Sequence, residues 1–297
     1  MLTHADFFAG LGVFSWVLHG NYIDRNLPKG VYRNMLRQID LCSGVGAGFP
    51  LAATIINGFK LRGLCERDEF CCDRLRDRFP GISIYPDVKE LWIEPNYADL
   101  ITASPPCPPF SLEGKRLGNQ DPRDCIPAVL RIVRRSQPKF FCLENVPGLL
   151  SAPINPGNEP GSYFQQMLRE LYTSGYDAEW VVVGTQQFET LWRGERLLLV
   201  ATSRCVVEKF SGLPTTWEYQ IRGASEETGH SPEKRSVQSR VAGTTVRTPD
   251  RLDIPPGTKS GNRINRARRA ALGNILDPRI AQIALQRVLY LNSLCKQ

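Results

Sequence analysis

The sequence lacks the patterns that mark membrane proteins, disulfide-rich secreted proteins and zinc proteins. It contains no run of about 18 apolar residues, so no membrane-spanning helix is expected. Its nine cysteines are an odd number and none forms a Cys-x-x-Cys pair, which favours free thiols in a reducing compartment. The apolar stretch 7–18 follows an acidic residue and has no basic segment or small-residue cleavage site, so we expect no signal peptide.

A complete glycine fingerprint for a dinucleotide is also missing. Gly44 and Gly46 follow an apolar run, but Phe49 stands where that fingerprint needs its third glycine. The sequence therefore argues against a nicotinamide or flavin enzyme and leaves an adenosine-type cofactor without a pyrophosphate. The two glycines still predict a tight turn at which the backbone approaches a ligand.

The residues that are present predict an α/β protein. The 297 residues are 42% hydrophobic, enough for a sizeable core in one large domain or two. Strand-like and helix-like stretches alternate from 39 to 201, which favours a doubly wound sheet. We expect strands at 61–65, 82–85, 99–102, 139–143, 180–183 and 196–201, and helices at 51–56, 124–136, 164–172 and 279–294. The continuous apolar runs of the last two strands predict that both are buried.

A proline-rich turn after the expected strand 99–102 is the candidate for the reactive centre. Four prolines surround Cys107 in this turn. Proline fixes φ and removes backbone donors, so the strand ends there and the thiol is held on a stiff loop. Open α/β sheets carry their chemistry just beyond the ends of their strands, so Cys107 is a candidate nucleophile rather than a structural cysteine.

Three acidic residues follow expected strands in the same way. Glu66 lies about 20 residues after the glycines, the usual place for a carboxylate that grips ribose hydroxyls. Glu144 ends an apolar strand, and burial there raises the pKa of a carboxyl group. Asp87 follows the strand 82–85 and, taken alone, is explained equally well as a turn residue or a helix cap.

The glycine turn occurs twice in the sequence. Residues 6–12 resemble residues 40–46, and only one copy can be a cofactor loop. We choose the second copy because a strand that ends in Glu66 follows it at the right distance, whereas no strand and acid follow Gly12 in this way. The first copy is interpreted as an accessory strand or an amphipathic helix.

Several motifs in order resemble the DNA (cytosine-5) methyltransferase family. They are Pro-Cys-x-x-Phe-Ser at 106–111, Gly-Lys-Arg-Leu-Gly with Asp-x-Arg at 114–123, and Glu-Asn-Val at 144–146. The resemblance runs from about residue 39 to 196 and resumes from 268 to 281. It implies a Rossmann-like sheet of the S-adenosylmethionine-dependent methyltransferases with a small target-recognition lobe.

The resemblance implies covalent catalysis on a cytosine that has left the base stack. Cys107 is then the nucleophile at C6, Glu144 the acid at N3, and Arg196 the group at the base O2. The family's Gln-x-Arg-x-Arg motif is incomplete here, because Trp192 and Gly194 occupy its first two positions. The candidate substrate-binding residues are Pro106, Ser111, Lys115, Arg116 and Arg123.

The resemblance also implies S-adenosylmethionine as the cofactor. The candidate cofactor-binding residues are Asp40, Cys42, Gly44, Gly46, Glu66, Asp87, Val88 and Asn274. Cys42 departs from the family, which usually has a phenylalanine there that packs on the adenine. By the same resemblance, Asp87 reaches the adenine amino group.

The chain is expected to have four parts. Residues 1–36 are an N-terminal extension of uncertain role, and residues 37–204 form the catalytic and cofactor-binding domain. By the resemblance, residues 205–261 hold a short target-recognition region. Periodicity fades there, as it also would in a surface insertion, and the basic residues favour recognition. Trp217 in this region is expected to stack on bases or to pack, as is Tyr219. Residues 262–297 return the chain to the catalytic domain.

The expected partner is double-stranded DNA, in agreement with a net charge of +7. We expect a monomer without a metal ion in the cytoplasm, encoded by a bacterium or a phage and belonging to a restriction-modification system. Two alternatives remain open. An RNA or tRNA cytosine-5 methyltransferase is compatible with the short target-recognition region, and a catalytically silent nucleic-acid-binding paralogue is compatible with Cys42, Trp192 and Gly194.

Overall fold

The computed structural model describes residues 35–106, 121–184, 194–221 and 276–295. The strands are β1 (Leu36–Leu41), β2 (Phe59–Cys65), β3 (Ser83–Tyr85), β4 (Leu100–Ala103), β5 (Phe140–Asn145), β6 (Tyr176–Gly184) and β7 (Glu195–Ser203). The helices are α3 (Phe49–Ile56), α4 (Glu69–Arg78), α5 (Ile126–Ser136), α6 (Ser162–Thr173), α7 (Arg204–Val207) and α10 (Pro278–Ser293), with a 3-10 turn η3 (Pro147–Ser151).

The seven strands form one mixed sheet in the order β3-β2-β1-β4-β5-β7-β6. The five strands from β3 to β5 are parallel, whereas β7 is antiparallel to both of its neighbours, β5 and β6. The chain moves outward from β1 to β3 and then crosses back to β4. The strand order therefore reverses between β1 and β4, which is where open α/β sheets bind their ligands.

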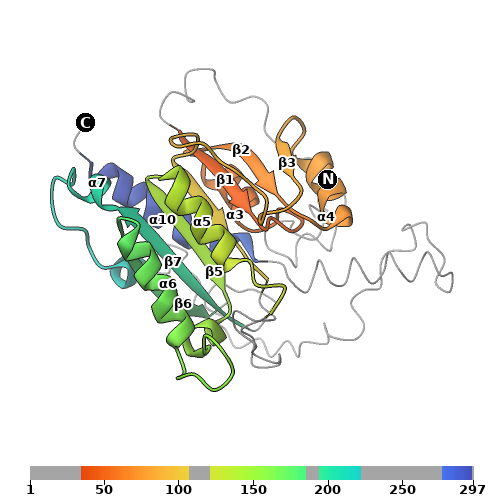
Figure 1. Cartoon of the computed structure of the whole chain (residues 1–297). Helices are drawn as coiled ribbons and strands as arrows, with labels where there is room; N and C mark the ends of the chain where they lie inside the picture. The colour runs from red at the N-terminus through yellow and green to blue at the C-terminus, as the bar shows by residue number, and fades with distance from the viewer. Residues whose placement is uncertain (1–34, 107–120, 185–193, 222–275, 296–297) are drawn as a thin grey trace, which may run out of the picture.

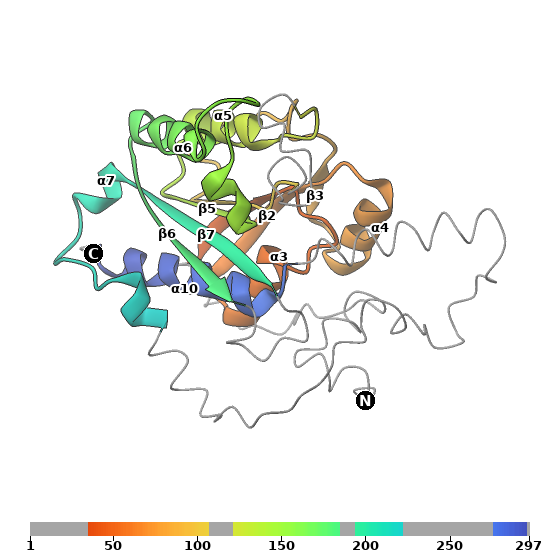
Figure 2. The same ribbon diagram turned by 90° about the horizontal axis from the view of Figure 1, so that it is seen from below.

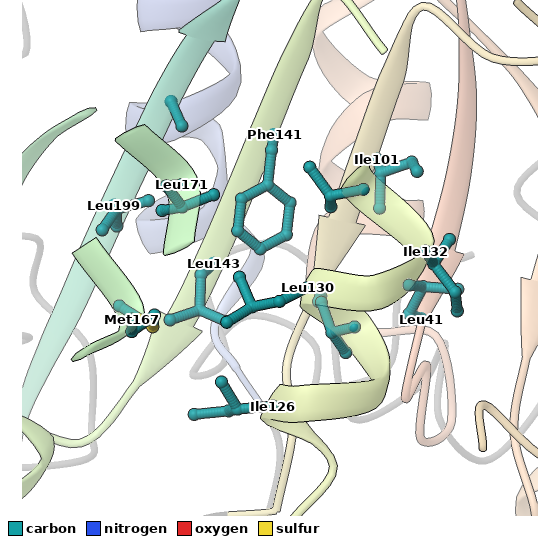
Figure 3. Packing of buried hydrophobic residues seen from close by; sticks show 14 of the residues in the cluster. Leu41, Ile101, Ile126, Leu130, Ile132, Phe141, Leu143, Met167, Leu171 and Leu199 are labelled. Carbon is teal, nitrogen blue, oxygen red and sulfur yellow. The ribbon is translucent and has the colours of Figure 1, made fainter. Parts of the chain in front are cut away.

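Helices cover both faces of this sheet, so the predicted doubly wound architecture is confirmed. Figure 2 shows α5 and α6 on one face and α3 and α10 on the other, and Figure 1 shows the same layers face-on. Under α5 and α6, side chains such as Leu130 and Met167 meet Phe141 and Leu143 of β5 in a buried core (Figure 3). Burial of this continuous apolar layer holds the central strands, and so their ends, in a fixed register.

The C-terminal helix α10 completes the opposite face. Ile280 and Ala284 are buried against the sheet and α3. Arg287 is only 2% exposed, and its guanidinium donates to both carboxylate oxygens of Glu179 on β6 at 2.6 and 2.9 Å. Pro278 occupies the first turn, where its missing N–H costs nothing. Helix α10 therefore lies on the sheet together with α3, and the assignment of residues 262–297 to the catalytic domain stays a prediction.

Strand β6 departs from the sequence prediction because it is not fully buried. Trp180 is 46% exposed and Val182 is 38% exposed, since β6 is the edge strand and pairs only with β7. The prediction of a buried strand is therefore wrong for β6, whereas β7 lies inside the sheet and is buried as expected. Trp180 instead packs edge-on against Phe164 of α6, with ring centroids 5.3 Å apart.

Residues 205–221 pack against the same body as α10. Val206 and Trp217 are buried in the core beside that helix, and Phe210 pairs with Cys295 as an isolated bridge. Trp217 therefore packs rather than presenting a face to bases, whereas Tyr219 is 71% exposed. None of the helices in the described ranges combines the length and the apolar character needed to cross a bilayer.

Candidate active site

The register of the parallel strands brings the predicted site residues to one edge of the sheet. Leu41 of β1 pairs with both Cys65 of β2 and Ala103 of β4, and Ala103 pairs with Leu143 of β5. The residues that follow these positions therefore lie side by side at this edge: Cys42, Glu66, Ser104 and Glu144, the last still within β5. Four segments that are distant in the sequence thus converge at the carboxyl edge, beside the reversal of strand order.

The turn after β1 is tied to the acid after β2. Gly44 has φ +55°, and its backbone N–H donates to Oε2 of Glu66 at 2.7 Å. The other oxygen of Glu66 accepts from the N–H groups of Arg67 and Asp68, both at 2.8 Å. A Cβ added at Gly44 would meet no atom within 4 Å, so this side of the turn is open. Backbone and carboxylate therefore frame an open space, as a ribose-binding site requires.

Gly46 is needed for packing, and its contact with the cofactor stays a prediction. Its φ is +76°, and a Cβ there would lie 2.6 Å from Cε2 of Phe79 and 2.8 Å from Cδ2 of Leu75. Both contacts are below the van der Waals limit. Glycine is thus required at this position because the turn lies directly against α4 and the residue that follows it.

Asp40 is enclosed beneath the same turn. It is 2% exposed, and its Oδ1 accepts from the hydroxyl of Thr102 at 2.5 Å. Gln38 in turn donates to that hydroxyl at 3.0 Å, so a polar chain crosses from β1 to β4. Burial raises the pKa of Asp40 to about 7, against the opposing hydrogen bonds from Thr102 and Ser43. Its contact with a neighbouring strand makes Asp40 a support for the turn.

The segment after β3 forms a second wall of the site. Asp87 Oδ1 accepts from the N–H of Lys89 at 2.8 Å, so Asp87 is a turn residue and not a helix cap. Val88 is buried, and Arg131 of α5 donates to the carbonyls of Val88 and Lys89 at 3.2 and 2.7 Å. The turn that carries Asp87 and Val88 is therefore held by α5 from behind.

Glu144 and Arg196 form an ion pair at the end of β5. Arg196 Nε lies 3.0 Å from Glu144 Oε1, and their side chains are 15% and 7% exposed. Glu144 pairs with Leu198 in the antiparallel register, which places Arg196 two residues along the same face of β7. Burial raises the pKa of Glu144, opposed by the charge of Arg196 and a hydrogen bond with Ser104. The carboxyl group is thus biased toward the protonated form that can donate.

Asn145 anchors the proline-rich turn beside this pair. Its Nδ2 donates to the carbonyl of Pro105 at 3.2 Å, while its Oδ1 accepts from the N–H of Val146 at 2.9 Å. Ser104 N also donates to the carbonyl of Leu41 at 3.1 Å. Pro106 is exposed at the end of this fixed stem. Sequence reasoning overlooked Asn145 as a functional side chain, although it lies in the middle of the Glu-Asn-Val motif.

The described chain resumes after the proline-rich turn with an arginine that already has a partner. Arg123 donates to both oxygens of Asp121 at 2.9 and 2.7 Å, and this hydrogen bonding lowers the pKa of Asp121 to about 2. A phosphate contact by Arg123 therefore has to compete with Asp121. Five predicted site residues lie outside the described residues: Cys107, Ser111, Lys115, Arg116 and Asn274.

The described ranges contain no group of three or more His, Cys, Asp or Glu side chains arranged to hold a metal ion. The donors that converge at the carboxyl edge are instead backbone N–H groups, carboxylates and one guanidinium. Such a set suits an organic cofactor with hydroxyl and amino groups together with a polar heterocycle.

Comparison with known proteins gives a family match over most of the chain. Residues 36–269 match the model of the C-5 cytosine-specific DNA methylases. The match includes the second glycine turn and excludes residues 6–12, which supports the choice made between the two copies.

The curated relatives match over shorter stretches. Type II methyltransferase M.NgoMIV of Neisseria gonorrhoeae is 29% identical over 55% of this chain and 50% of its own length. Type II methyltransferase M.BsuFI of Bacillus subtilis is 41% identical over 34% of this chain and 24% of its own length. The chain thus spans half or less of the length of these relatives. Among solved structures, the Dnmt2 methyltransferase of S. pombe has a TM-score of 0.51 at 16% identity, over 68% of this chain and 57% of that one, which shows a shared fold.

Proposed function

Because the chain belongs to the C-5 cytosine-specific DNA methylase family, we propose that it transfers a methyl group from S-adenosylmethionine to C5 of cytosine in double-stranded DNA. The Glu144–Arg196 pair carries the proposal. It lies at the carboxyl edge beside the anchored stem Ser104-Pro105-Pro106, which leads directly to Cys107 in the sequence.

Cys107 is proposed as the nucleophile. Cytosine C5 is a weak nucleophile, and addition of a thiolate to C6 gives it the electron density of an enamine. When bound, S-adenosylmethionine supplies an electrophilic methyl group. The base is reached only after it leaves the duplex stack, so the chain has to hold a flipped nucleotide.

Glu144 and Arg196 are proposed to hold and protonate that base. The neutral carboxyl group of Glu144 donates to N3 and accepts from the exocyclic amine, a pattern that suits cytosine. Arg196 places a positive charge near O2 and holds the Glu144 side chain from the neighbouring strand. Protonation at N3 draws electrons from the ring and so favours attack of the thiolate at C6.

The residues at the edge between β1 and β3 fit the cofactor. Gly44 leaves open space in front of the carboxylate of Glu66, which suits the ribose hydroxyls. Asp87 and Val88 lie on a turn braced by α5, which suits the adenine. Asp40 and Gly46 shape the turn from behind. Cys42 occupies the position at which the family usually has a phenylalanine that packs on the adenine. Asn274 remains a proposed contact, and Leu276 already packs beside Gly48 of the turn.

Recognition of DNA is proposed for the segment after residue 221. Residues 205–221 pack on the catalytic core, so we place the end of the catalytic domain after them. The remaining segment to 261 carries several arginines and lysines for phosphates and guanines. We further propose that the enzyme acts as a monomer in the cytoplasm of a bacterium or on phage DNA there, as the modification enzyme of a restriction-modification system.

The test compares nucleic acids and a covalent trap. We expect tritiated methyl groups to enter double-stranded DNA but not tRNA, and methylation-sensitive sequencing to locate them at cytosine C5. DNA that contains 5-fluorocytosine should form a stable adduct with the enzyme, and Cys107→Ser should form none while keeping cofactor binding. Methylation of tRNA alone would favour the RNA enzyme. Cofactor binding without any transfer would favour the silent paralogue.

A further inference from the structure

Two side chains of α10 hold residues 215–221, a segment that we call the stem. Arg287 donates from Nη1 to Oε1 of Gln220 at 3.2 Å. The hydroxyl oxygen of Tyr290 accepts from the N–H and from the hydroxyl of Thr215, at 2.9 and 3.1 Å. Arg287 and Tyr290 are three residues apart and so lie on one face of the helix, with the guanidinium 5.2 Å from the centroid of the ring. One face of α10 therefore binds the stem near both of its ends.

The local structure of the stem directs Gln220 toward α10. Thr216 starts a helical turn, because its Oγ1 accepts from the N–H of Tyr219 at 3.4 Å and its carbonyl accepts from the N–H of Gln220 at 3.3 Å. Trp217 in this turn is 5% exposed and packs in the core beside α10, and Ile221 is partly buried against the same core. Helical spacing places Gln220 on the face of these two apolar residues. The stem is therefore attached to α10 by apolar contacts as well as by hydrogen bonds.

The buried charge of Arg287 is compensated without the stem. Its side chain is 2% exposed, and its Nε and Nη2 donate to the two carboxylate oxygens of Glu179 on β6 at 2.6 and 2.9 Å. This side-on pair leaves Nη1 directed at Gln220. The bond to Gln220 is therefore not required to neutralise the guanidinium. Its effect is geometric, because it fixes the stem to a side chain that already joins α10 to β6.

The bond to the stem lies far along α10 from the cofactor edge. A Cβ on Gly48, in the glycine turn, would lie 3.0 Å from Leu276, just before the helix begins. A Cβ on Gly58, beyond the other end of α3, would lie 2.9 Å from Leu289, which is close to Arg287 in the sequence. Helix α10 therefore runs along α3 away from the glycine turn. Loss of the bond to the stem should for this reason leave the cofactor edge intact.

We propose that Arg287 is a positioning residue that, through Gln220, sets where the DNA-recognition segment leaves the catalytic core. That segment begins at residue 222, directly after the stem. The inference rests on the proposed function, which assigns recognition of DNA to this segment. Without the bond the segment leaves the core from a less defined position, so fewer encounters place the target base at Glu144. The KM for DNA should then rise, whereas cofactor affinity and the rate at saturating DNA should not change.

The experiment substitutes Gln220, because removal of the buried guanidinium would itself destabilise the fold. Gln220→Ala removes the acceptor, so hydrogen–deuterium exchange of the stem amides in the full-length protein should become about threefold to tenfold faster. Assays with tritiated S-adenosylmethionine and duplex DNA should show the KM for DNA raised by about the same factor at unchanged kcat. Calorimetry with S-adenosylhomocysteine should show the affinity of the unaltered protein.

Gln220→Glu and Gln166→Ala are the matched controls. Gln220→Glu keeps an acceptor for Arg287 and adds the charge of an ion pair, so it should retain normal exchange and a normal KM for DNA. Gln166→Ala removes a surface glutamine of α6 that donates to Glu170, and it should change neither quantity. Unchanged exchange in Gln220→Ala would show that the bond does not hold the stem, and faster exchange with an unchanged KM would overturn the positioning role. If the unaltered protein methylates no DNA, the proposed function fails, whereas the exchange result still decides whether the bond holds the stem.

Discussion

The two edges of the sheet carry carboxyl groups with opposite electrostatics. At the amino edge, Asp99 precedes β4 and accepts from Arg37 at 2.8 Å and from Lys139 at 3.1 Å. Burial alone would raise its pKa, but these hydrogen bonds outweigh it and lower the pKa to about 2. At the carboxyl edge, burial prevails and raises the pKa of both Asp40 and Glu144.

This contrast separates residues that stabilise the fold from residues that are kept for the site. Asp99 has two cationic partners and backbone donation, so its charge is compensated and its ion pairs favour the folded state. Glu144 has one cation, and Asp40 has only hydroxyl donors among the groups that contact its carboxylate. A carboxyl group with a raised pKa costs folding energy at neutral pH, and such costs gather at functional sites.

The largest expected effect comes from Glu144→Gln. The amide keeps the shape and a donor at N3 but cannot deliver a proton, so single-turnover methyl transfer should fall about 10²–10⁴-fold. The unfolding free energy should also fall, by up to about 3 kcal/mol, because the amide leaves the largely buried guanidinium of Arg196 without its anionic partner. Single-turnover assays with tritiated cofactor and urea unfolding measure the two quantities.

The neighbouring exposed Glu195 supplies the control for this change. Glu195→Gln alters the same charge on β7 without entering the buried pair, and should retain the unaltered rate. If the Glu144→Gln enzyme transferred methyl groups at the normal rate, Glu144 would have a structural role only. The two edges of the sheet would then not differ in function as proposed.

The second effect is a pH dependence of stability that originates in Asp40. Its folded-state pKa of about 7 exceeds the ordinary value of 3.8, so the folded state binds the proton more tightly. The stabilisation that this tighter proton binding gives the folded state is fully present below the ordinary pKa and is lost as pH rises through about 7. The total loss of unfolding free energy is roughly 4 kcal/mol. Asp40→Asn should abolish this decline in urea unfolding between pH 5 and pH 8. The exposed Asp73→Asn should leave it in place, and an unchanged decline in Asp40→Asn would contradict the assignment.

The sequence was sufficient to predict most of the strands and of the helices that cover the sheet. Apolar runs and turn residues predicted β2 to β5, α3, α5 and α6 to within a few residues, because burial on both faces leaves a strong pattern. Helix α4 was missed, since its charged segment Glu69–Arg78 has little apolar periodicity. Asp68 was the available signal, because its side chain caps the helix by accepting from Cys71 N.

The partners within the site were less predictable than the site residues. Glu144 and Arg196 were both chosen from motifs, but their ion pair depends on β7 entering the sheet antiparallel beside β5. No local pattern records such contacts, because they arise only when crossover connections fix the strand order.

The third prediction sharpens the division of roles within the carboxyl edge. Gly46→Ala forces a methyl group against Phe79 and Leu75, so it should lower the unfolding free energy by about 1–3 kcal/mol. Gly44→Ala meets open space, so it should cost only the strain of a positive φ, about 1 kcal/mol. Its methyl group would enter the proposed cofactor space and weaken S-adenosylhomocysteine binding severalfold by calorimetry. Equal losses of stability in Gly44→Ala and Gly46→Ala would contradict the assignment of Gly46 to packing and of Gly44 to the cofactor space.

The smallest expected effect is at the amino edge. Asp99→Asn removes two ion pairs that are partly screened by solvent, so it should lower the unfolding free energy by about 1 kcal/mol at pH 7. Because the pKa of Asp99 is lowered, its contribution is present above about 4 and is lost as pH falls through about 2. The difference from the unaltered protein in urea unfolding should therefore shrink between pH 7 and pH 3. The control Asp177→Asn, whose partner Arg204 is 3.8 Å away, should change stability less.

S-adenosylhomocysteine affinity and methyl transfer should stay unchanged in Asp99→Asn, because the amino edge lies at the opposite end of β4 from the site. A loss of transfer without a loss of stability would show that the two edges are not separate in function.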